Sequence, residues 1–134
     1  MESPSREDDQ SPDTMDVDEA YQHVFFCFML ALRNLATLEP ATQCDAKGNR
    51  IVAHELQNEI LSGRYVIGKG KLNTSEESAI AALAAAVGTV PDSALGFANG
   101  MQHPAWTPLR SQANLLLTQL APRIAENNSY FKHS

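Results

Sequence analysis

The chain has 134 residues, of which 43% are hydrophobic, and its formal net charge is −6. This length suits a single domain with a tail, and the hydrophobic fraction is sufficient for an ordinary core. Its two cysteines lack Cys-x-x-Cys spacing, which argues against a disulfide framework and against a cysteine-based zinc site.

The negative charge is concentrated at the N-terminus. Residues 1–19 contain eight acids and one base, whereas the rest of the chain contains eight acids and nine bases. Because residues 1–17 offer few apolar side chains, we predict a disordered acidic tail. It could solubilise the domain, fold back on a basic surface or carry an export signal. The apolar run starts late and no cationic segment precedes it, so we expect a cytoplasmic protein, or one exported without a conventional signal peptide.

The first predicted helix begins at Asp16 or Asp18 and ends before Pro40. Its middle, residues 24–32, carries no polar side chain, but a membrane span needs roughly 20 apolar residues, so no membrane insertion is expected. Either the rest of the domain encloses this apolar middle, with the Ala-rich segment 79–87 as a neighbour, or part of it forms a dimer or partner surface. The residues predicted for that surface are Phe26, Met29 and Leu30.

Three more helices are predicted in the centre of the chain. An amphipathic pattern predicts a helix over 50–63, closed by its terminal glycine. Residues 64–72 are too short and Gly-rich for a helix, and they form at most one short β element. Thr74 and Glu77 have capping-box spacing and predict a helix that runs to residue 88. A proline predicts a further short helix over 91–99.

The last predicted helix begins near Thr107, and Pro122 kinks or ends it. Trp106 could stack on a ligand, but its large apolar area favours burial as an anchor. Strand signal is minimal, so we predict an all-α fold, a compact bundle of about five helices, with 18–126 as a single helical domain and 127–134 as a flexible C-terminus. The inner stripe of the last helix consists of Leu109, Ala113, Leu116 and Leu120.

A glycine-rich segment at 63–70 matches part of a phosphate-binding loop. It ends in Gly70 where Ser or Thr would hold magnesium, and a helix precedes it where a strand is required, so nucleotide hydrolysis is not predicted. The segment could still form a modest cationic site for phosphate, nucleic acid or the acidic tail, or it could be a solvated turn. The candidate contacts are Arg64, Tyr65, Lys69 and Lys71.

No catalytic or metal-binding set is legible in the sequence. His54 and Glu55 begin an H-E-x-x-H pattern, but Asn58 replaces the second histidine. The acids of the body are dispersed, and no constellation of nucleophile and base appears. We therefore predict no enzyme activity, no cofactor and no metal ion.

Residues 83–116, LAAAVGTVPDSALGFANGMQHPAWTPLRSQANLL, resemble the helix-turn-helix of the phage-repressor (Cro and lambda-repressor-like) class. The resemblance rests on Val87 and Gly88 at the turn, and on Ala94 and Phe97 in the second helix. It implies a DNA-binding regulator, although the would-be recognition helix carries no Arg, Lys or Gln. The DNA contacts it implies are Ser93, Asn99, Gln102 and His103.

The leading functional hypothesis is a small, non-enzymatic helical protein that binds another protein or itself, as an adaptor, inhibitor or immunity-type protein does. It rests on the apolar middle of the first helix and on the missing catalytic set. The alternatives are a DNA-binding transcriptional regulator and a secreted effector with an N-terminal export tail.

Overall fold

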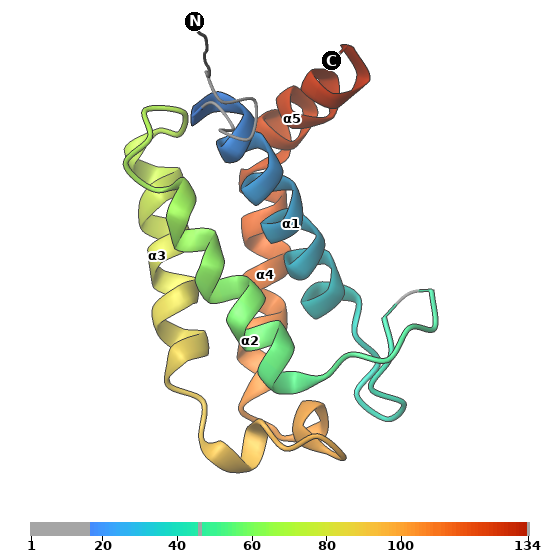
Figure 1. The fold of residues 1–134 in the computed structure, drawn as a ribbon. Helices are drawn as coiled ribbons and strands as arrows, with labels where there is room; N and C mark the ends of the chain where they lie inside the picture. The colour runs from blue at the N-terminus through green and yellow to red at the C-terminus, as the bar shows by residue number, and fades with distance from the viewer. Residues whose placement is uncertain (1–16, 46, 134) are drawn as a thin grey trace, which may run out of the picture.

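The structure, a computed structural model, describes residues 17–45 and 47–133. These residues form five α-helices and three short 3₁₀ turns, and they contain no sheet (Figure 1). The predicted all-α class of about five helices is confirmed. Of the predicted acidic tail, residues 1–16 lie outside the described residues. The elements are α1 (Val17–Thr37), α2 (Ala53–Ser62), η1 (Gly63–Val66), α3 (Thr74–Gly88), η2 (Asp92–Ala94), η3 (Gly100–Gln102), α4 (Trp106–Gln119) and α5 (Ala121–His133).

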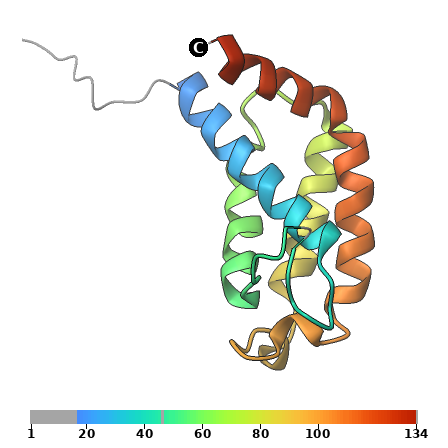
Figure 2. The same ribbon diagram turned by 90° about the vertical axis from the view of Figure 1, so that its right-hand side faces the viewer.

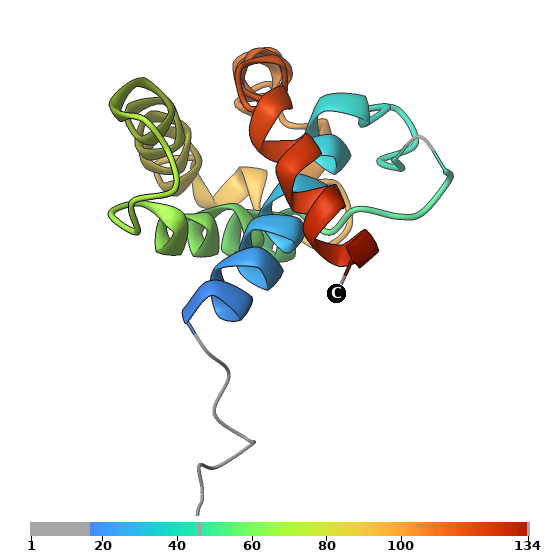
Figure 3. The same cartoon turned by 90° about the horizontal axis from the view of Figure 1, so that it is seen from above.

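α1 is the central element of the bundle. It packs mainly on α4 and α2, while α5 turns away from α4 and reaches the first turns of α1 (Figures 2 and 3). The Ala-rich α3 packs on α2 and α4. It was predicted beside α1, and this neighbour assignment is wrong because α2 and α4 occupy the positions next to α1.

The core consists of one apolar cluster to which every α-helix contributes. From α1 it takes large side chains such as Phe25, Phe28 and Leu32, each at most 1% exposed. The predicted inner stripe of α4 is confirmed, because its four residues are 0–5% exposed. Trp106 is also buried, and its Nε1 donates a hydrogen bond of 2.9 Å to the carbonyl of Ala94, so it anchors the preceding loop.

Two boundaries differ from those predicted, whereas segment 64–72 stays within the prediction of at most one short β element. Asn73 caps α3 and shares a capping box with Glu76, one residue before the predicted pair. Residues 64–72 form η1 and turns, with no strand among them. α4 ends just before Pro122, as predicted, but the chain continues as α5 through His133. Residues 127–133 are therefore helical, where a flexible end was expected.

Polar contacts hold α5 against the bundle and explain this order. Asn127, which is 1% exposed, donates through Nδ2 to the backbone oxygen of Gln22 at 3.0 Å and to its Oε1 at 2.8 Å. Arg123 Nε lies 3.0 Å from Oε1 of the buried Glu76 in α3. These bonds satisfy groups that would otherwise be buried without partners, and they join α5 to both α1 and α3.

Replacing Asn127 by alanine should lower the free energy of unfolding by about 1 kcal/mol, because two hydrogen bonds are lost and the half-buried acceptors of Gln22 lose their donor. Urea denaturation followed by circular dichroism measures this difference. Asn128→Ala is the matched control, since Asn128 is exposed on the same helix. Equal stability of the two variants would contradict the described packing of α5.

Tyr21 makes the stability of the fold depend on pH in the alkaline range. Burial raises the pKa of its hydroxyl from 10.0 to about 12. An unfolded chain would ionise this group near pH 10, whereas the folded protein keeps it neutral, so its stabilising contribution is lost as the pH rises from about 10 to about 12. In an absorbance titration of the three tyrosines, we expect one to ionise last and Tyr21→Phe to remove that step. Ionisation of all three near pH 10 would contradict the burial of Tyr21.

Candidate functional site

One long side of α1 remains uncovered. Its solvent-facing residues recur at intervals of three and four, which places them along a single helix face. At its centre, the large apolar side chains Phe26 and Leu30 are 36% and 40% exposed. We call this surface the outer face of α1; it consists of His23, Phe26, Cys27, Leu30, Arg33 and Thr37.

The predicted enclosure of α1 by the rest of the domain is therefore realised in part, and the predicted dimer or partner surface stays a prediction. The domain covers most of the helix, and a strip containing Phe26 and Leu30 stays accessible. Met29 was predicted on this strip, and the structure corrects that prediction, because Met29 is 1% exposed and belongs to the core cluster. At about 100° per residue, Met29 lies roughly 60° to one side of Phe26, so it falls under the neighbouring helices while Phe26 does not.

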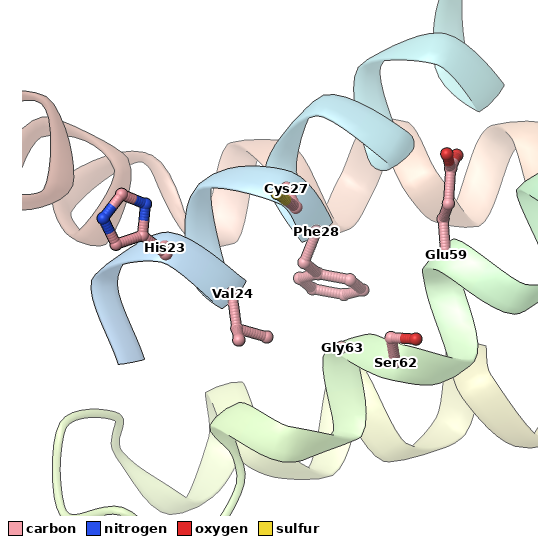
Figure 4. Close-up of a pocket in the computed structure, with 7 residues that line it drawn as sticks. All are labelled: His23, Val24, Cys27, Phe28, Glu59, Ser62 and Gly63. Atoms are coloured by element: carbon pink, nitrogen blue, oxygen red, sulfur yellow. The ribbon is translucent and has the colours of Figure 1, made fainter. Parts of the chain in front are cut away.

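A groove of about 360 Å³ runs beside this face, between α1 and α2. Val24 and Phe28 point from α1 toward α2, and Glu59 rises from α2 at one end of the groove (Figure 4). Gly63 lets the helices approach, since a Cβ atom there would overlap the ring of Phe28. The groove is lined by His23, Val24, Cys27, Phe28, Glu59, Ser62 and Gly63.

A second hollow, of about 240 Å³, lies on the opposite side of Phe26 and is formed with α5. Phe131 of α5 contacts Phe26 edge-on, with ring centroids 5.6 Å apart, and it contacts His23 in the same manner at 5.1 Å. The aromatic surface thus extends from α1 onto α5. Sequence reasoning missed Phe131, although Ile124, Asn127 and Phe131 have helical i, i+3, i+7 spacing that could have revealed it.

The predicted cationic site is divided among local contacts. Lys71 Nζ forms an ion pair with Asp18 Oδ1 at 2.7 Å, and this hydrogen bond lowers the pKa of Asp18. Lys69 Nζ lies 4.2 Å from the centre of the Tyr65 ring. The amide of residue 68, which a phosphate-binding loop would present to its ligand, donates to Glu77 Oε2 at 2.8 Å.

Of this predicted set, Arg64 and Tyr65 are exposed on η1, and Arg64 Nε donates to the carbonyl of Leu61 at 3.3 Å. The backbone amide of residue 68 therefore already binds the Glu77 carboxylate, and Lys71 already binds the Asp18 carboxylate. Binding of an external anion remains a prediction.

The helix predicted over 91–99 is absent, and that prediction is wrong. Only η2, three residues long, forms there. Side chains from other segments donate to backbone carbonyls of this stretch: Trp106 Nε1 bonds Ala94, whose carbonyl a helix would use, and Gln43 Nε2 bonds Ala98 at 2.7 Å. Arg50 also bonds the carbonyl groups of Phe97 and Ala98, at 2.8 and 3.0 Å.

The four residues that the helix-turn-helix resemblance implied as DNA contacts do not share one helix. Ser93 and Asn99 are exposed, whereas Gln102 Nε2 donates to the carbonyl of Ala41 at 3.2 Å and His103 Nδ1 accepts from the amide of Ala105 at 3.0 Å. Gln102 is thus bonded to the segment after α1, and His103 is bonded within its own loop. DNA binding by this segment remains a prediction.

Within residues 17–45 and 47–133, no group of three or more His, Cys, Asp or Glu side chains is placed to hold a metal ion. In the same ranges, no helix is long and apolar enough to cross a bilayer. Comparisons with models of protein families, with curated proteins and with solved structures gave no match. The outer face of α1 and its two hollows are therefore the strongest candidate site in the described part of the chain.

Proposed function

We propose that this chain is a non-enzymatic protein-binding module and that it binds through the outer face of α1. The observation that carries the proposal is the exposure of Phe26 and Leu30, 36% and 40%, beside hollows on the side of α1 that faces away from the core. Exposed large apolar residues beside a concave surface are typical of protein contact sites. The aromatic contact of Phe26 with Phe131 widens this apolar surface.

A position-specific photocrosslinking experiment tests this function. A photoreactive amino acid is introduced at Leu30 and, as a control, at Leu115 of α4, which is 72% exposed. In cells that express the full chain, we expect a saturable protein adduct from position 30 that position 115 does not give. Adding Phe26→Glu to the position-30 protein should abolish this adduct.

Light scattering of the purified chain shows whether the partner is a second copy, because the solution mass would then be twice that of one chain. In that case the photocrosslinked adduct would be a covalent dimer. Identical adducts from positions 30 and 115 would overturn the proposal, since they would report random collision. The proposal also fails if position 30 gives no adduct and the purified chain is monomeric.

A further inference from the structure

On the α2 side, Glu59 lines the groove, and a second acid, Glu55, lies just beyond its lining. Glu55 and Glu59 are exposed and lie one helical turn apart, and no ion pair joins either of them to another residue in the described ranges. Like charges at this spacing repel each other. Partial burial of the carboxylate and the charge of Glu55 both raise the pKa of Glu59.

The α1 side of the same groove is apolar. Val24, Cys27 and Phe28 form its wall, and Phe26 and Leu30 continue the apolar surface along the outer face. The charged or titratable groups of α1 beside it are His23, at the groove itself, and Arg33, beyond Leu30. An occupant therefore meets apolar side chains along α1 and negative charge along α2.

This charge distribution discriminates between possible occupants. Residues 1–19 have eight acids and one base, so the N-terminal segment would bring negative charge to Glu55 and Glu59. A symmetric pair with antiparallel α1 helices would place the acidic α2 side of one copy opposite that of the other. Both arrangements set like charges against each other, which disfavours binding.

We propose that the groove between α1 and α2 binds a basic amphipathic helix of a partner protein. Its apolar residues would enter the groove beside Cys27 and Phe28, and its Lys or Arg residues would pair with Glu55 and Glu59. Apolar side chains at i, i+3, i+4 and i+7 are the usual anchors of a helix bound in such a groove. This inference rests on the proposed function and specifies its partner.

Two synthetic peptides provide the test. Both are amphipathic helices with the same leucine stripe, and they carry either lysine or glutamate at the positions that flank it. Titration of each labelled peptide with the full chain, at about 0.15 M salt, is followed by fluorescence anisotropy. We expect the lysine peptide to bind at least about tenfold more tightly than the glutamate peptide, because several charge pairs change sign.

Substitutions locate the bound peptide on the protein. Glu55→Gln and Glu59→Gln should each weaken binding of the lysine peptide about two- to fivefold, as expected for exposed ion pairs. Asp92→Asn, an acid on η2 away from the groove, should leave it unchanged and controls for general attraction to an acidic chain. Bound peptide should also slow alkylation of the exposed Cys27 while the half-buried Cys44 reacts as before.

The inference is overturned if the double variant Glu55→Gln/Glu59→Gln binds the lysine peptide as tightly as the unaltered chain does, or if Cys27 is not protected. Tighter binding of the glutamate peptide would also overturn it. None of these outcomes removes a position-30 adduct in the photocrosslinking experiment. Failure of the charge assignment is thereby distinguished from failure of the proposed function.

Discussion

Met29→Glu is expected to unfold the domain at ordinary temperature, whereas Leu30→Glu, one residue further on, is expected to leave it folded. Met29 is 1% exposed and Leu30 is 40% exposed. The first change places a carboxylate in the apolar core without a partner and should cost more than about 4 kcal/mol. The second places a charge at the surface and should cost about 1 kcal/mol or less.

Thermal denaturation followed by circular dichroism separates these two outcomes, because a folded Leu30→Glu protein keeps its helical signal and its cooperative transition. The comparison also decides which substitutions can be used in binding experiments. A folded, stable Met29→Glu protein would mean that α1 is rotated about its axis relative to the described packing, and the outer face of α1 would then be wrongly assigned.

Gly63→Ala is the second substitution with a large expected effect. A Cβ atom at this position would overlap the ring of Phe28, which is itself 1% exposed and has little room to move. We expect the free energy of unfolding to fall by roughly 1–3 kcal/mol, as is usual for overpacked cores. Because Phe28 and Gly63 both line the groove, the lysine peptide should also bind more weakly.

Gly88→Ala is the matched control for this measurement. Gly88 also lies at the end of a helix, but the nearest atom to an added Cβ would be Leu61 Cδ2 at 3.7 Å, an ordinary contact. It should therefore be neutral or slightly stabilising, since alanine favours helix over glycine. If urea denaturation gave the two variants equal stability, the close approach of α2 to Phe28 would be contradicted.

Local sequence patterns were sufficient for most of the helical architecture. The apolar stripe of α4 and the stop before Pro122 both follow from side-chain periodicity and backbone chemistry, and the structure agrees with them. The burial of Trp106 follows in the same way from its apolar area. These features depend on residues close together in the chain.

The differences arise where distant residues decide the outcome. Residues 91–99 look helical by themselves, but Trp106 bonds the Ala94 carbonyl that a helix would use, and Gln43 and Arg50 hold the end of the segment through the carbonyls of Phe97 and Ala98. α5 looks too polar to be ordered, but the bonds of Asn127 to Gln22 fix it. Neither pairing is visible in a local pattern, because the partners are separated by tens of residues.

The candidate site was predictable only in part for the same reason. Helical geometry placed Phe26, Met29 and Leu30 in the same sector as the polar residues at both ends of the helix, and of these Phe26 and Leu30 are exposed. It could not tell which side of that sector α4 and α5 would cover, so Met29 was misplaced. The groove with α2 and the contribution of Phe131 depend on how whole helices pack, which the sequence pattern of one helix does not contain.

Gln43 joins two segments that are far apart in the chain. It adopts a left-handed backbone conformation (φ 57°), and its side chain donates to the carbonyl of Ala98 and accepts from the amide of Met101. Residues 39–51 and 91–103 therefore cannot lose their structure independently. In hydrogen-exchange measurements their protected amides should become exchangeable together, as a single cooperative unit, although more than 40 residues separate Arg50 from its bonding partner Phe97.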